Sequence, residues 1–475
     1  MNKSLTQRIF FSWSADIITT IAGFLGTIYL ARTLGPAPLG VFALVISVIK
    51  WLLICDIGIT QAAIKRISEG ENDGEVITAT FVLQTTITVF AIGMLFLFRG
   101  TVNSYIGGPY VVYIAVLFGM NYLASGTVSQ ILRGYQRVDI SNGLYALERT
   151  MRVAFQVGLV FVGFRITGLM IGMITSLALM TIVGAIYLLS RTDLNPTIPR
   201  KQNFVDIVSF AKYSVLGVMK SQAFTWMDIA IMGVFVSNSV IGIYNVSWTL
   251  AMTFVLLANS IQKNLFPEVS SLIISDETDR VRELLSESML YAGLLPIPGI
   301  VGALLLGDSV LTIYGPKFTE GQFILVLLVI VALLRAYDGQ VHAVIDGFDR
   351  PDLTFRINII FLITNIVLNV ILIPTYGSLG AAMATVLSTC LSVLVSWQMA
   401  SSLVSSSFPI YGVAKQITAA IIMGAVVILF EVIFPSTNVI NTLLLIGLGA
   451  LVYFSILFIL LDEIRSKTLE IATNI

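Results

Sequence analysis

The chain has 475 residues, of which 57% are hydrophobic and only 11% are charged, and its mean hydropathy is +0.93. A soluble domain carries about 25% charged residues, so this composition could not cover an aqueous surface. Lysine plus arginine equals aspartate plus glutamate, 27 against 27, which leaves no basic field to recruit nucleic acid. The composition therefore predicts an integral membrane protein without a nucleic-acid partner.

Membrane-spanning helices are expected along the whole chain. Each needs about 20 mostly apolar residues to cross a bilayer, and about fourteen such stretches are present. In chain order they lie at residues 12–32, 40–63, 76–98, 110–132, 144–164, 168–190, 208–235, 240–265, 285–306, 321–345, 354–374, 378–400, 413–434 and 440–461. No connecting loop exceeds about 20 residues. We therefore expect an all-α polytopic protein with no room for a soluble domain.

Basic residues indicate the orientation of these spans, because short cytoplasmic loops collect lysine and arginine. In this topology one side receives 17 of the 27 basic residues, and six more fall inside spans. The opposite side receives only Arg32, Arg99, Arg165 and Lys317. The even number of spans and this asymmetry predict that both termini are cytoplasmic.

Residues for enzymatic or metal chemistry are scarce. The chain has two cysteines, Cys55 and Cys390, and a single histidine, His342. Few residues are therefore available to form a hydrolase active site or a metal site. No GxxxxGK[ST] phosphate-binding loop occurs. We expect no enzyme activity, no metal and no cofactor.

An internal repeat relates the two halves. Residues 133–139 (RGYQRVD) match residues 346–352 (DGFDRPD) at a shift of 213, and Gly40 corresponds to Gly242. We interpret this as two pseudo-symmetric six-helix halves, residues 1–203 and 204–403, followed by a terminal helix pair in residues 404–475. Halves of this kind can rock in alternating access. The alternative is that glycine and arginine recur at helix ends for capping and topology reasons alone.

Cations inside spans suggest an anionic cargo. A charge within the bilayer is costly, so it must meet a partner or water. The cations that could hold a phosphate head group are Lys50, Lys220, Arg335 and Arg152. Each could instead belong to a buried ion pair, for example Arg335 with Asp338, or Arg152 with Glu148 at helical spacing.

Other candidate residues share these spans. A proton or sodium ion could be bound by Asp16, Asp56, Asp228, Asp338 or His342. Alternatively, the aspartates neutralise neighbouring lysines, and His342 is solvated near the cytoplasmic end of its span. Trp51 and Trp226 could stack on sugar rings or serve in ordinary packing.

The segment from residue 29 to residue 69, YLARTLGPAPLGVFALVISVIKWLLICDIGITQAAIKRISE, resembles a known family. It is similar to the polysaccharide flippase branch of the multidrug/oligosaccharidyl-lipid/polysaccharide exporter superfamily. The motifs that carry the resemblance are the run from Ala31 to Pro36 followed by Gly40, then Asp56-x-Gly58, and Lys65-Arg66 before Glu69.

The resemblance implies a V-shaped transporter in the cell membrane. It would move oligosaccharide linked to a polyprenyl or dolichyl (pyro)phosphate from the cytoplasmic to the outer leaflet. Besides membrane lipids, its implied partners are a glycan polymerase or glycosyltransferase of the same pathway. Apart from Arg32 at its outer end, the first expected span carries Asp16 as its only charge, unlike the arginine-rich first span of lipid II flippases.

Other classes of function remain as alternatives. A cation- or proton-coupled multidrug exporter of the same superfamily would use Asp16 or Asp228 as an acidic cation site. A membrane glycosyltransferase or ligase would need sizeable outer loops, and these are short here. A non-transporting scaffold would leave the buried charges without a purpose.

Overall fold

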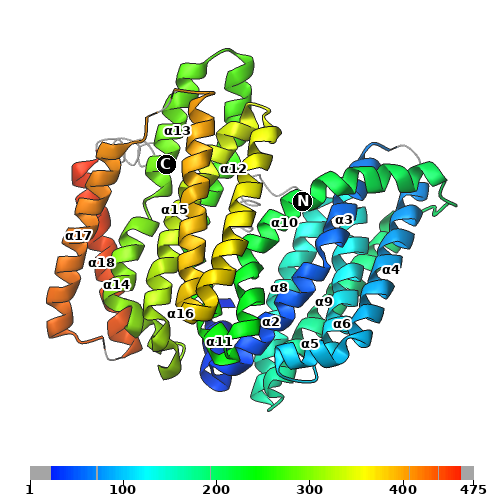
Figure 1. The fold of residues 1–475 in the computed structure, drawn as a ribbon, viewed down its shortest axis with the longest axis horizontal. Coiled ribbons are helices and arrows are strands. Elements are labelled where there is room, and N and C mark those ends of the chain that lie inside the picture. The colour runs from blue at the N-terminus through cyan, green and yellow to red at the C-terminus, as the bar shows by residue number, and fades with distance from the viewer. Residues whose placement is uncertain (1–22, 71–72, 193, 406, 437, 462–475) are drawn as a thin grey trace, which may run out of the picture. The chain divides into compact units, whose positions relative to one another are not determined.

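The computed structural model describes residues 23–461, except 71–72, 193, 406 and 437. Across these residues the regular structure is helical and no strand is present, so the all-α prediction is confirmed. The chain divides into two compact units, Met1–Gly242 and Ile243–Ile475, and Figure 1 shows their helices in chain colours. The candidate residue Asp16 lies outside the described residues.

Within the described part of the first unit, residues 23–34 are helical. Its further helices are α2 (Pro36–Leu52), α3 (Ile54–Ser68), α4 (Asp73–Leu97), α5 (Arg99–Ile106), α6 (Val111–Asn121), the π-helix η1 (Tyr122–Ser129), α7 (Gln130–Gly134), α8 (Val138–Phe161), α9 (Arg165–Arg191) and α10 (Lys201–Phe235). The next helix, α11 (Asn238–Thr253), crosses the boundary between the units.

The second unit contains α12 (Leu256–Ile274), α13 (Thr278–Ala292), α14 (Pro296–Thr312), the 3₁₀ helix η2 (Pro316–Gly321), α15 (Gln322–Gly347), α16 (Pro351–Ser401), α17 (Ile410–Ile433) and α18 (Val439–Leu460). Helix α16 combines the two spans expected at 354–374 and 378–400. Gly377 separates them with a φ of 58°, a left-handed conformation that glycine adopts without strain.

Apolar surface on these helices is typical of a lipid environment. Among the described residues, eight helices are long and apolar enough to cross a membrane, or up to ten if each of two bent pairs is one span. The expected number of fourteen stays a prediction. In α17 and α18 large apolar side chains are widely exposed, such as Val432 at 79% and Ile459 at 72%. These faces suit contact with lipid chains.

The repeat extends to the local backbone conformation. The pair α2 and α3 bends by 50°, and the pair α11 and α12 bends by 51°. Gln136 and Asp349, which are aligned in the repeat, have φ values of 59° and 54°. In both loops the next amide donates to the carbonyl five residues earlier, as at Schellman helix ends. The same cap geometry also occurs at Gly163 and Asp276, outside the matched residues 133–139 and 346–352, so the alternative of recurring helix caps stays open.

The boundaries of the predicted halves at residues 203 and 403 stay a prediction. Helix α10 begins at Lys201 and was expected to open the second half. It packs against α2, α3 and α4 within the first unit.

Two glycines that correspond in the repeat pack against each other in the first unit. A Cβ atom on Gly40 would collide with the carbonyl oxygen of Asn238, and one on Gly242 would collide with that of Pro36. In each case the obstructing carbonyl lies four residues before the partner glycine. Small residues allow helix backbones to approach closely in membranes. The start of α2 and the first turn of α11 therefore cross so closely that their backbones are in contact.

Alanine at this crossing should destabilise the protein. Because backbone rather than a mobile side chain obstructs the new methyl group, we expect Gly40→Ala or Gly242→Ala to cost about 1–3 kcal/mol. A fall in the melting temperature of the detergent-solubilised chain would measure it. Gly119→Ala is the matched control, since nothing lies within 4 Å of a Cβ there. Unchanged melting of both crossing variants would contradict the packing.

Candidate cargo-binding cavity

A cavity of about 360 Å³ lies inside the first unit. Helices α2, α3, α8 and α9 contribute to its wall, together with η1 and the adjoining ends of α6 and α7. Its charged lining residues are Lys50, Asp56, Arg133, Glu148 and Arg152. The predicted candidates Lys50, Asp56 and Arg152 thus line one space.

Two irregularities in the helices shape this cavity. The break at Leu53 separates Lys50, in the last turn of α2, from Asp56, in the first turn of α3. Opposite them, η1 is a π-helix, a form frequent at functional sites. A Cβ on Gly126 in η1 would lie only 3.1 Å from Asp56 Oδ2 and from Gln84 Nε2. The glycine therefore leaves room for the carboxylate.

One ion pair in the cavity was predicted and is confirmed. Arg152 Nε lies 3.7 Å from Glu148 Oε1, one helical turn away on α8. Ser176 Oγ on α9 also donates a hydrogen bond of 2.9 Å to this carboxylate. Glu148 is only 7% exposed, so the pair reduces the cost of burying its charge.

Two further cations lack a carboxylate partner. No carboxylate among the described residues lies within ion-pair distance of Lys50 or Arg133. Arg133 instead donates to the neutral oxygens of Ser141 at 3.0 Å and Asn142 at 3.4 Å, over the ring of Tyr145. Sequence reasoning did not select Arg133 as a binding residue, although it begins the repeated motif. With the Arg152 pair set aside, the cavity holds two cations and one anion.

The anion, Asp56, is also without a counter-charge. It is 4% exposed, forms no ion pair with a described residue, and its Oδ1 has no hydrogen-bond partner. Close by, Gln84 Nε2 donates to Thr60 Oγ1 at 3.0 Å and lies 3.5 Å from Gln130 Oε1. These glutamines were not recognised as site residues from the sequence.

Other predicted residues of the first unit lie outside the lining. Helix α10 carries half-buried Lys220 and buried Asp228, and neither is among the described residues that line the cavity. Trp226 packs against the apolar core, and its carbonyl accepts a hydrogen bond from Ser47 Oγ at 3.2 Å. The ring N–H of Trp51 is buried without a hydrogen-bond partner. Sugar stacking by either tryptophan stays a prediction.

The candidates of the second unit lie on α15. Asp338 accepts a hydrogen bond of 2.9 Å from Ser396 Oγ, and its Oδ2 lies 3.4 Å from His342 Nε2. His342 is only 7% exposed. The expectation that it is solvated is wrong, because α12, α13, α14 and α16 surround α15. Arg335, the predicted head-group cation, precedes Asp338 by one turn of the same helix.

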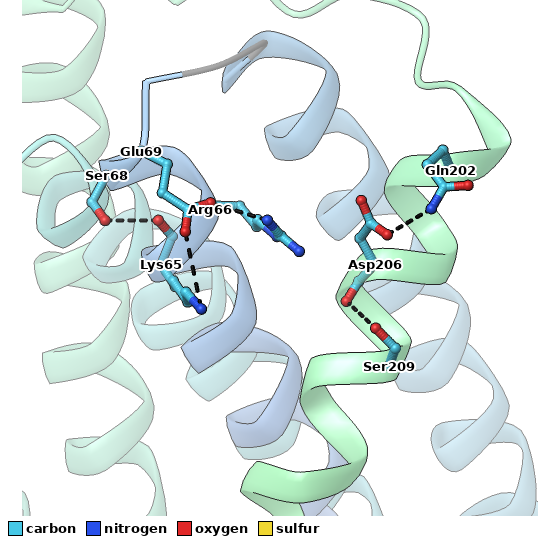
Figure 2. Close-up of polar contacts among 7 residues, drawn as sticks. All are labelled: Lys65, Arg66, Ser68, Glu69, Gln202, Asp206 and Ser209. Carbon is cyan, nitrogen blue, oxygen red and sulfur yellow. Dashed lines mark hydrogen bonds and ion pairs between the residues drawn. The ribbon is translucent and has the colours of Figure 1, made fainter.

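The charged residues at the end of α3 are exposed and paired, unlike Lys50 and Asp56 in the cavity (Figure 2). Lys65 and Arg66 both reach Glu69, at 4.0 Å and 3.1 Å, and all three side chains are substantially exposed. On α10, Gln202 donates to Asp206 at 2.7 Å. Such exposed local pairs contribute little to stability. Lys65 therefore provides a control for the unpaired Lys50.

Comparison with known proteins identifies the family. The sequence profile of the family described as polysaccharide biosynthesis protein matches residues 29–321. The probable flippase AglR of Haloferax volcanii is 32% identical over 467 residues, covering 97% of both chains. The probable low-salt glycan biosynthesis flippase Agl15 of the same organism is 29% identical and covers 93% of both. The chain belongs to the polysaccharide biosynthesis protein family.

A solved structure shares the fold. The lipid II flippase MurJ in an inward closed conformation superposes with a TM-score of 0.79 at 16% identity. The match covers 95% of this chain and 98% of that one. This likeness shows the fold, and the long apolar helices indicate a multi-pass membrane protein.

The Arg152 pair can be tested for its structural role. Glu148→Gln keeps the shape but removes the carboxylate, and we expect a loss of about 1–3 kcal/mol. The loss should stay below that of a fully buried pair, because the Arg152 side chain is 33% exposed. Adding Arg152→Gln should restore most of the melting temperature of the detergent-solubilised chain. A double variant no more stable than Glu148→Gln would refute the pairing.

Proposed function

We propose that this protein flips lipid-linked oligosaccharide from the cytoplasmic to the outer leaflet of the cell membrane. The single observation that carries the proposal is the excess of unpaired cations, Lys50 and Arg133, in the cavity of a polytopic protein. The flippase names of the two relatives from Haloferax volcanii support it. The cargo is a glycan on a polyprenyl or dolichyl phosphate or pyrophosphate.

The cavity suits the phosphate part of this cargo. Lys50 acts as a point charge, while the planar guanidinium of Arg133 can form two parallel hydrogen bonds with phosphate oxygens. Arg152 supplies further positive potential when cargo competes for its pair with Glu148. The predicted cations Lys220 and Arg335 act on the same head group in other stages of the cycle. The hydrocarbon tail stays in lipid, because its transfer into a polar cavity would be unfavourable.

The remaining parts of the proposal follow from topology and pathway. The basic residues favour cytoplasmic termini, so the cavity loads where glycan lipids are assembled. Alternating access by the two repeat-related halves then moves the head group. The protein is a transporter without catalytic activity, supplied by a glycosyltransferase or serving a polymerase of the same pathway.

A multidrug exporter is the second candidate. A cationic drug requires an acidic cavity. The acidic residues among the described lining residues are Asp56 and Glu148, and Glu148 is paired with Arg152. Asp228 is buried in the first unit outside this lining. The unpaired cations outnumber Asp56 in the cavity and would repel such a cargo. The sign of the cavity charge therefore favours the glycan lipid.

Replacing the unpaired lysine should stop transport. We expect Lys50→Ala to abolish flipping without lowering membrane abundance, and Lys220→Ala to do the same if both lysines contact the head group. Lys50→Arg should retain part of the activity, because it keeps the charge. The readout is the sidedness of lipid-linked oligosaccharide, measured with an impermeant glycan-modifying enzyme on intact spheroplasts.

Lys65→Ala is the control, since this lysine is exposed and pairs with Glu69. Normal sidedness in cells that carry only Lys50→Ala or Lys220→Ala would overturn the assignment. Disappearance of the variant proteins would instead assign both lysines a structural role.

The coupling ion is proposed to bind at Asp56. A carboxylate buried among spans without a counter-charge is costly, so it must be neutralised by a proton or a monovalent cation. Its free Oδ1, the cavity beside it and the glycine at position 126 provide access and space. Asp338 is less suited to this role, because serine hydroxyls and His342 already contact its carboxylate.

Removing this charge should uncouple transport. Asp56→Asn mimics the neutralised carboxylate, so we expect normal abundance but no response of flipping to an imposed gradient. Reconstituted vesicles with a proton gradient and, separately, a sodium gradient would identify the ion. Glu69→Gln, which changes an exposed carboxylate, should respond like the wild type. An Asp56→Asn protein that still responds to the wild type's gradient would refute the site.

A further inference from the structure

The second unit contains a cavity at the position that corresponds to the first one. It has a volume of about 740 Å³ and lies between α12 and the end of α15. The shift of 202 that aligns Gly40 with Gly242 also aligns four of its lining residues with four lining residues of the first cavity. On α12 these are Asn259, Gln262, Lys263 and Phe266, and on α3 they are Ile57, Thr60, Gln61 and Ile64.

The chemistry of the second cavity differs from that of the first. The shift of 213 places Asp346 where the first cavity has Arg133. Asp349 adds a second carboxylate, and Lys263 is the single cation among the described lining residues. Two carboxylates would repel a phosphate group. The second cavity is therefore not a copy of the phosphate site.

Most of its polar groups are available to a ligand. The side chains of Asn259, Gln262, Lys263 and Asp349 make no hydrogen bond or ion pair with any residue that the structure describes. Asp346 keeps one free carboxylate oxygen, because only its Oδ1 accepts a hydrogen bond, from Thr354 Oγ1 at 2.7 Å.

The geometry of α12 aims these groups at one space. Residues 259, 262, 263 and 266 follow the spacing of a single helix face. Across from them, a Cβ on Gly339 would lie 2.8 Å from Gln262 Oε1, so this glycine makes room for the amide. The ring of Phe266 is 46% exposed at the end of the same face.

We infer that this second cavity binds the sugar part of the cargo, an inference that rests on the proposed function. Carboxylates accept hydrogen bonds from sugar hydroxyls, and side-chain amides both donate and accept. An exposed aromatic ring beside them offers an apolar face to the C–H groups of a pyranose. The first cavity thus offers cations to a phosphate, and the second offers hydrogen-bonding groups and an aromatic ring to a sugar.

Binding of two matched probes to the purified full-length chain tests this division. The probes are a polyprenyl phosphate that carries one hexose and the same polyprenyl phosphate without sugar. Gln262→Ala, Asp349→Asn and Phe266→Ala should each weaken the hexose probe about tenfold, which corresponds to about 1.4 kcal/mol, and leave the bare lipid within twofold. Lys50→Ala should weaken both probes.

Asn264→Ala is the matched control, because this exposed amide lies on α12, is not among the described lining residues and bonds to its own helix. Equal affinity of the second-cavity variants and the wild type for the hexose probe would overturn the sugar site. So would parallel losses for both probes. If the wild type binds neither probe and leaves lipid-linked oligosaccharide sidedness unchanged, the proposed function itself fails, which is a different result.

Discussion

The cost of a charge inside a membrane governs the arrangement of this protein. Without water, an ionised side chain must be paired, neutralised or reserved for a ligand. Glu148 forms an ion pair with Arg152, and the carboxylate of Asp338 is contacted by serine hydroxyls and by His342. Lys50 and Asp56 both line the first cavity, and neither forms an ion pair with a described residue. Their retention is understandable if an anionic head group and a small cation complete the site.

The two cavities have similar local backbone features but different lining chemistry. Both units contain a bent helix pair, with bends of 50° and 51°. Each also has a residue in the left-handed conformation, Gln136 in the first and Asp349 in the second. Side chains that line a cavity are freer to change than those that set a bend. Arg133 at one lining position corresponds to Asp346 at the other, and this difference is the basis for our proposal that the two cavities bind different parts of the cargo.

Sequence periodicity predicted contacts within a helix better than contacts between helices. The pairing of Glu148 with Arg152 followed from helical spacing, and its geometry is confirmed. The burial of His342 was missed, because position near a span end does not reveal how many helices cover it. Arg133 and Gln84 were overlooked for a related reason, since their importance arises from what α3 and η1 place beside them.

Hydropathy, charge position and motif spacing are properties of the chain, so the membrane location, the helical class and the family resemblance could be predicted without coordinates, and the repeat stays a prediction. Which charges share a cavity and which glycines are in contact depend on how the helices pack, and no sequence pattern shows this. Gly40 and Gly242 are aligned in sequence, yet their contact depends on how two helices cross. Likewise, the sequence offered Asp56 as one of several candidate ion sites, and only the packing shows that it is buried with its Oδ1 unpartnered.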